Sequence, residues 1–240
     1  MPPLSSLRNR IGFVVIFIFV LQNALAAPAR VHVITLGKWT TVQWFPAAGS
    51  AEDKPLTLKV RPLLLDAHVK EFTLGPAHDI TDRLFVIRRA FRLNDSLPQE
   101  ASTPHWQWQR GGWLLVDRTT GRISPIHLPD FDALYSAVSW YRDYAAYCGV
   151  SDDGKKIYAI VAQLNRRKPV LKKLLDNARI AEEETKDAAV DACPVPAWQR
   201  PPVRVIFEPA GTPKQIFAFR GHAVDLVNDA EEQEDEEGSK

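Results

Sequence analysis

Apolar and polar residues alternate along most of the chain, whereas the three-to-four-residue period of amphipathic helices is scarce. The alternation is clearest over residues 56–66 (LTLKVRPLLLD), 83–93 (RLFVIRRAFRL) and 156–164 (KIYAIVAQL). Successive side chains of a strand point to opposite faces of its sheet, so this pattern predicts strands with one buried face. The chain is therefore expected to be all-β.

Shorter segments predict further strands, separated by turns that contain glycine, proline or aspartate. Gly75-Pro76 and residues 109–112 (QRGG) are among the predicted turns, and Pro62 indicates an edge strand or a bulge. Many short strands joined by turns predict an antiparallel meander, arranged either as a fragment of a β-propeller or as two packed sheets. The other predicted strands cover residues 31–36, 39–45, 70–74, 106–109, 112–117, 122–127, 137–150, 169–175, 203–208 and 215–219.

Residues 27–228 are expected to form a single all-β domain. Three segments of the chain differ from the β pattern. Residues 1–26 combine a basic start, the apolar run IGFVVIFIFVL and the motif Ala24-Leu25-Ala26, which together predict a cleaved signal peptide. An uncleaved membrane anchor is the alternative. Residues 176–192 (DNARIAEEETKDAAVDA) predict a mobile insertion, irregular or forming one short helix. Residues 229–240 hold seven acids and one lysine, and predict a disordered acidic tail.

Export would place the protein in the periplasm or outside the cell, with no stable membrane span once the signal peptide is removed. Residues 27–228 carry 27 basic and 22 acidic residues, a net charge of +5 that is spread along the chain. Such a diffuse excess does not predict nucleic-acid binding. The expected partner is an envelope protein or a glycan.

Cys148 and Cys193 are the two cysteines of the chain. An even pair in an oxidising compartment favours a disulfide between them, and two buried thiols are the alternative. No histidine stands at ligand spacing from either cysteine, so the sequence predicts no metal site there. No cofactor is predicted either.

Asp152, Asp153 and Gly154 form the most conspicuous polar cluster between two apolar runs. A calcium loop needs alternating oxygen ligands and a distal glutamate, whereas here two lysines follow the glycine directly. Asp-Gly between alternating segments is instead typical of a β-hairpin, because glycine adopts positive φ without steric cost. We expect a hairpin corner.

The region around Trp106, Trp108 and Trp113 offers the best candidate ligand site. A hairpin with its turn at residues 109–112 would bring Trp113 close to Trp108, and Arg110 could contribute a positive charge. Such a platform could bind a sugar ring or an aromatic ligand. The alternative is that these tryptophans pack the sheet, as cross-strand aromatic residues commonly do.

No motif of nucleophilic, phosphate-binding or dinucleotide-binding enzymes occurs in the chain, so no catalytic residue is predicted. Asp130, Asp132 and Asp143 lie near the aromatic region and are the nearest approach to a carboxylate pair. Turn formation and ion pairing are the ordinary explanation for all three.

Two turn motifs resemble those of bacterial β-propeller repeats. Residues 151–158 (SDDGKKIY) resemble the Ser-Pro-Asp-Gly-x-x-Ile-Tyr corner of such repeats, with Asp152 in place of the proline. Residues 117–122 (DRTTGR) resemble their Asp-x-x-Thr-Gly-Lys/Arg hairpin turn. The segment PHWQWQRGGWLLVDRTTGRISP is similar to a group of uncharacterised exported bacterial proteins, which implies no activity.

The expected function is that of an exported binding or interaction module of the cell envelope. A carbohydrate-binding or carbohydrate-active protein that uses a Trp-rich surface is one alternative. A subunit of an envelope assembly is another.

Overall fold

The computed structural model describes residues 32–44, 56–94, 96, 104–175, 193–220 and 223–227. All regular secondary structure in these residues is β-strand, arranged in several packed antiparallel sheets, which confirms the predicted fold class. Within the same residues there is no helix long and apolar enough to cross a membrane. The predicted signal peptide, insertion and acidic tail lie outside the described residues.

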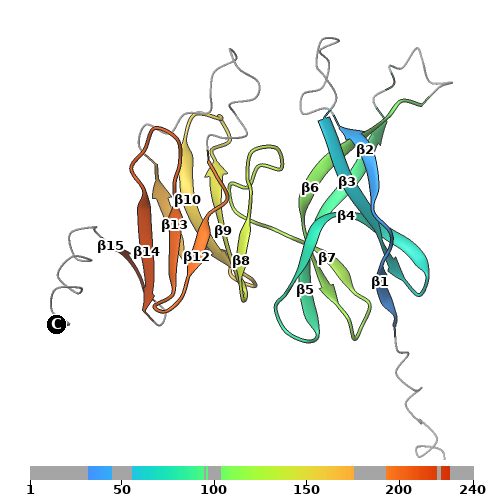
Figure 1. Cartoon of the computed structure of the whole chain (residues 1–240), viewed down its shortest axis with the longest axis horizontal. Coiled ribbons are helices and arrows are strands. Elements are labelled where there is room, and N and C mark those ends of the chain that lie inside the picture. The colour runs from blue at the N-terminus through green and yellow to red at the C-terminus, as the bar shows by residue number, and fades with distance from the viewer. Residues whose placement is uncertain are drawn as a thin grey trace, which may run out of the picture. The chain divides into compact units, whose positions relative to one another are not determined.

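The first sheet closes on itself, because its long strands pair in a ring. β3 pairs with β2 and with β4, β4 with β5, and β5 with β6. A parallel bridge between Trp44 and Trp108 joins β2 to β6 and completes the ring. Figure 1 draws this sheet in blue to green; its strands are β1 (Ile34–Leu36), β2 (Thr40–Trp44), β3 (Leu56–Leu65), β4 (His68–Asp79), β5 (Leu84–Asn94), β6 (Trp106–Asp117) and β7 (Ile123–Ile126).

β1 and β2 act as two halves of one interrupted strand along β3. Leu36 pairs with Leu63 and Thr40 pairs with Val60. In the gap between the halves, the Gly37 N–H donates to the Pro62 carbonyl over 2.8 Å. The register of β3 against β4 shifts just beyond the proline, but the extra residue, Lys70, belongs to β4, and Pro62 itself pairs in register with Phe72.

Two predicted turns are wrong, because each is a bulge inside a continuous strand. Gly75-Pro76 lies within β4, where the five residues Leu74–His78 lie opposite only three residues of β5, Val86–Arg88. Gly75 adopts a φ of 63°, which glycine reaches without strain. Residues 109–112 lie within β6, where the register against β5 shifts by one residue. A glycine-rich bulge and a glycine-rich turn look alike in sequence, and only the neighbouring strands distinguish them.

The second and third sheets are meanders of four consecutive antiparallel strands. This is the arrangement that the resemblance to propeller repeats implies, and membership of that family stays a prediction. The second sheet contains β8 (Ser139–Tyr141), β9 (Tyr144–Val150), β10 (Ile157–Gln163) and β11 (Leu171–Leu174); the third contains β12 (Ala197–Gln199), β13 (Arg204–Phe207), β14 (Gln215–Arg220) and β15 (Ala223–Val227) (Figure 1).

The single strand predicted over residues 137–150 is wrong, because a tight turn divides it into β8 and β9. Arg142 adopts a φ of 51° in this turn, and Tyr141 pairs directly with Tyr144. The charged residues Arg142 and Asp143 form the turn, but no glycine or proline marks it in the sequence. β12 and β15 were not predicted either.

The hairpin corner at residues 151–156 is confirmed. Val150 pairs with Ile157, and the Ser151 N–H donates to the Lys156 carbonyl over 2.9 Å. The Asp153 carboxylate accepts bonds from the Ser151 hydroxyl and the Lys155 N–H within the corner. The polar side chains of this corner therefore serve its own backbone.

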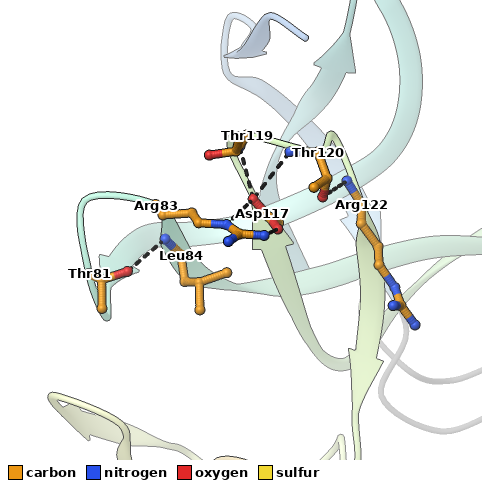
Figure 2. A network of polar contacts seen from close by, with 7 residues as sticks. All are labelled: Thr81, Arg83, Leu84, Asp117, Thr119, Thr120 and Arg122. Carbon is orange, nitrogen blue, oxygen red and sulfur yellow. Dashed lines mark hydrogen bonds and ion pairs between the residues drawn. The ribbon is translucent and has the colours of Figure 1, made fainter. Parts of the chain in front are cut away.

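The predicted turn at residues 117–122 is also confirmed, and it joins β6 to β7. Figure 2 shows the Asp117 carboxylate at its centre, where it accepts bonds from the Arg83 guanidinium and from the N–H groups of Thr119 and Thr120. The Thr120 hydroxyl accepts a further bond from the Arg122 N–H. These bonds, led by the one from Arg83, hold the pKa of Asp117 well below its usual range.

The predicted disulfide between Cys148 and Cys193 is present and lies in the core shared by the second and third sheets. Cys148 belongs to β9, and Cys193 precedes β12 by four residues. Both are buried, in a cluster that also contains Val205, Phe207 and Phe217 of the third sheet. The bridge therefore links the two sheets covalently through their common core.

A second core joins the closed sheet to the second sheet. It brings Val86 of β5 and Trp113 of β6 together with Tyr147 of β9 and Ile160 of β10. Two further clusters fill the closed sheet. The contact between β6 and the second sheet borders the candidate site.

Candidate ligand-binding site

A cleft of about 540 Å³ lies between the irregular part of the closed sheet and β8 of the second sheet. The bulge of β4 at residues 75–77 forms one wall, and residues on either side of the β5–β6 register shift form another. Bulges redirect side chains, and they often occur beside functional sites. The basic and aromatic residues that line the cleft are Lys59, His78, Arg88, Arg110, Trp113 and Trp140.

Arg88 of β5 is held by backbone carbonyl groups. Its guanidinium donates to the Ala133 carbonyl over 2.5 Å and to the Gly111 carbonyl over 3.3 Å. Burial, and then repulsion from Arg110, lower the pKa of Arg88 to about 10, against a smaller opposing effect of Asp132. Arg88 therefore remains charged at neutral pH, with its charge poorly solvated.

Arg110 of β6 lies with its guanidinium carbon 4.0 Å from the centre of the buried Trp44 ring. Burial lowers the pKa of Arg110 as well. The described residues form no hydrogen bond and no ion pair with this guanidinium. Five N–H donors in a planar group are thus held in place by an aromatic face, with their hydrogen-bonding capacity unused.

Trp113 and Trp140 form the aromatic wall of the cleft, with their rings 5.3 Å apart in an edge-to-face arrangement. The His78 ring stacks on Trp140 at 6.1 Å and bonds the Arg142 carbonyl over 2.9 Å. Trp113 is only 9% exposed, yet neither indole N–H has a hydrogen-bond partner among the described residues. Buried polar groups normally find partners, so these two donors are exceptions that need an explanation.

The cleft carries positive charge without a matching carboxylate, since no aspartate or glutamate is among the residues that line it. Three arginines elsewhere form ion pairs, Arg83 with Asp117, Arg89 with Glu71 and Arg118 with Asp79, whereas others, such as Arg92, form none between described residues. Arg88 and Arg110 take part in none of the ion pairs between described residues. The cleft is lined by both of these arginines.

The predicted platform of Trp106, Trp108, Arg110 and Trp113 is divided by the structure. Arg110 and Trp113 line the cleft. Trp106 and Trp108 lie further along β6 and surround Arg92, whose guanidinium carbon is 5.6 Å and 5.5 Å from their ring centres. The expected hairpin is wrong: the strand continues, and its register shift at residues 111–112 leaves Trp113 packing against the second sheet, while Trp108 packs with the core of the closed sheet.

Sequence reasoning missed Arg88, His78 and Trp140 as members of this site. Arg88 was visible only as part of a basic pair with Arg89, and the two point to different partners in the structure. His78 and Trp140 are 62 positions apart in the sequence and meet through sheet packing. No local pattern connects them.

The three aspartates considered for catalysis have structural partners. Asp130 pairs with Lys172 over 2.8 Å, and Asp143 accepts a bond from the Gln163 amide over 2.8 Å. Asp132 accepts bonds from the N–H groups of Leu134 and Tyr135. Across the described ranges, no group of three histidine, cysteine, aspartate or glutamate residues is placed to hold a metal ion.

Comparison with protein-family models, with curated proteins and with solved structures finds no match to this chain. The candidate site is therefore judged on its own geometry.

Proposed function

We propose that the chain is a binding module whose cleft holds an anionic ligand with an apolar face. The observation that carries this proposal is the group of donors in one cleft: the Arg110 guanidinium, which has no hydrogen-bond partner among the described residues, the Arg88 guanidinium, which uses two donors on backbone carbonyls, and the unpartnered indole N–H groups of Trp113 and Trp140. Two like charges packed together weaken a fold, and a bound anion would remove that cost.

The magnitudes favour an anion over a neutral ligand. A hydrogen bond to a charged group contributes about 1.5–3 kcal/mol, against about 0.5–1.5 kcal/mol for a neutral pair. No described residue accepts a hydrogen bond from the Arg110 guanidinium. The Arg88 guanidinium uses two of its donors on backbone carbonyl groups. Trp113 and Trp140 line the same cleft and would contact the apolar part of the ligand.

We also propose that the protein is exported and acts in the cell envelope. The N-terminal pattern of basic residues, apolar run and Ala24-Leu25-Ala26 supports export. The Cys148–Cys193 disulfide supports it further, because structural disulfides persist in oxidising compartments.

Titration with glucuronate, followed by tryptophan fluorescence, tests the proposed function. Glucose is the neutral control, since it has the same ring without the carboxylate. The variant Arg110→Gln removes the unpaired guanidinium and should weaken glucuronate binding by about 10-fold to 100-fold, the loss of one charge-assisted bond.

Arg92→Gln is the matched control variant, because Arg92 also stacks on tryptophan rings but does not line the cleft. It should bind glucuronate as the wild type does. Equal affinity of the wild type for glucose and glucuronate would refute the proposal, as would equal losses in both arginine variants.

A second candidate function, a subunit of an envelope assembly, rests on the open edges of the small sheets. β11 pairs with β10, and β15 pairs with β14; neither has a partner on its other side among the described residues. Such edges can accept a strand from another chain. Light scattering of the purified protein tests self-assembly through these edges, for which a single monomeric species would be contrary evidence.

A further inference from the structure

A second cleft of about 700 Å³ continues the first one across the bulge of β4. The two clefts share Lys59 of β3 and the bulged residues Gly75 and Pro76. The second is otherwise lined by Trp39, Thr41 and Arg61. Together they form one groove that passes over the β4 bulge.

Arg61 repeats in the second cleft the arrangement of Arg110 in the first. Its guanidinium carbon lies 4.3 Å from the centre of the Trp39 ring, and burial lowers its pKa. One of its terminal nitrogens donates to the Gly75 carbonyl over 3.3 Å, while its Nε is buried without a partner among the described residues. Trp39 itself is 46% exposed.

Positive charge is continuous along the groove. Lys59 and Arg61 are two residues apart on β3, so their side chains project from the same face about 7 Å apart along the strand. No aspartate or glutamate lines the second cleft, and neither side chain takes part in an ion pair between described residues. Basic and aromatic side chains therefore line both clefts.

We infer that the ligand is an acidic oligosaccharide that extends along both clefts; this rests on the proposed function of the first cleft. A chain of uronic acid residues offers a carboxylate and an apolar ring face at each unit, which matches arginine and tryptophan side chains in both clefts: Arg61 with Trp39 in the second, and Arg110 with Trp113 and Trp140 in the first. Its hydroxyl groups can accept from the unpaired indole N–H groups. Nucleic acid is less suited, because its dense phosphates call for a more strongly basic surface.

Comparison of galacturonate with tetragalacturonate, by calorimetric titration of the full chain, tests this inference. Contacts in a second cleft act at high effective concentration once the first is occupied. The tetramer should therefore bind at least about tenfold more tightly than the monomer. Trp39→Ala should abolish most of this gain and leave monomer affinity unchanged.

Trp106→Ala is the matched control, since Trp106 is also an exposed tryptophan beside an arginine but lies outside both clefts. It should keep the full gain. Circular dichroism of both variants checks that they are folded. Arg61→Gln, which removes the partner of Trp39, should reduce the gain in the same way as Trp39→Ala.

The outcomes separate this inference from the proposed function. Equal affinity for monomer and tetramer, or a gain that Trp39→Ala does not change, overturns the extended ligand and leaves the anion site in place. Failure of both sugars to bind overturns the two together. Tighter binding of a single-stranded oligonucleotide or of polyglutamate than of tetragalacturonate overturns the assignment of the ligand as a glycan.

Discussion

Reduction of the Cys148–Cys193 disulfide should destabilise the protein. It adds one hydrogen to each sulfur and removes no atom from the core. The bridge joins residues 45 positions apart. Cross-linking a loop of this length lowers the entropy of the unfolded chain by about 13 cal/mol/K, which corresponds to about 4 kcal/mol at 25 °C. For a protein of this size the midpoint of thermal unfolding should fall by about 8–16 °C.

Urea denaturation of the oxidised and the reduced protein, followed by tryptophan fluorescence, measures this difference. The reduced unfolded chain is less constrained and exposes more surface, so the slope of the free energy of unfolding against urea should also increase. The double variant Cys148→Ala/Cys193→Ala should lose more stability than reduction alone. Both sulfur atoms are buried against the third sheet, and their removal leaves unfilled space.

A loss below about 1 kcal/mol on reduction would refute the loop-entropy reasoning. Two titratable thiols in the unfolded, unreduced protein would refute the bridge itself.

The remaining predictions concern the folding of the closed sheet. Gly37→Ala should destabilise the protein by about 1–3 kcal/mol in urea denaturation, because the added Cβ would lie 2.6 Å from the Pro62 side chain. Gly112→Ala is its control: no atom lies within 4 Å of the corresponding Cβ, so an equal loss in both variants would contradict the steric explanation. Asp117→Asn should lower the thermal midpoint at pH 7, since the carboxylate is stabilised in the folded state by Arg83. Because the pKa of Asp117 is lowered on folding, its contribution is present above the unfolded pKa of about 4 and is lost as pH falls towards the folded value. Wild type and Asp117→Asn should therefore converge in thermal stability at acidic pH, and a constant difference from pH 7 to pH 2 would be evidence against the linkage.

The fold class was predictable because alternation is a local property of the sequence. The strands that the pattern predicted best are β3, β5 and β10; β3 alternates between buried and exposed positions, whereas β10 and the first half of β5 are buried on both faces. Both motifs taken as hairpin corners, at residues 117–122 and 151–156, are such corners, because their aspartates and glycines satisfy the turn backbone locally. The disulfide followed from the cysteine count and the expected compartment.

Two of the errors lie where pairing with neighbouring strands decides the structure, and a third lies at an unmarked turn. Gly75-Pro76 and residues 109–112 have the composition of turns, but the neighbouring strands hold them as bulges. The turn at Arg142 has no glycine or proline to mark it. Local sequence cannot distinguish these cases, since the difference lies in the partner strands.

The candidate site was half predictable for the same reason. Arg110 and Trp113 drew attention because they stand in a tryptophan-rich segment, and both line the cleft. Arg88 and Trp140 come from other strands. Arg88 lies beside the register shift between β5 and β6, and Trp140 reaches the cleft because β8 of the second sheet packs against the closed sheet. Trp106 and Trp108 belong to the same segment but to another surface.

The affinity of the Arg110→Gln variant for glucuronate, compared with that of the wild type, is the most direct test of the anion site. A cleft that uses its unpaired guanidinium to hold a carboxylate predicts a loss of about 10-fold to 100-fold, with Arg92→Gln unchanged and glucose bound weakly by all three proteins. Identical glucuronate affinities for wild type and Arg110→Gln would show that the charge in the cleft serves no ligand, and would contradict the account.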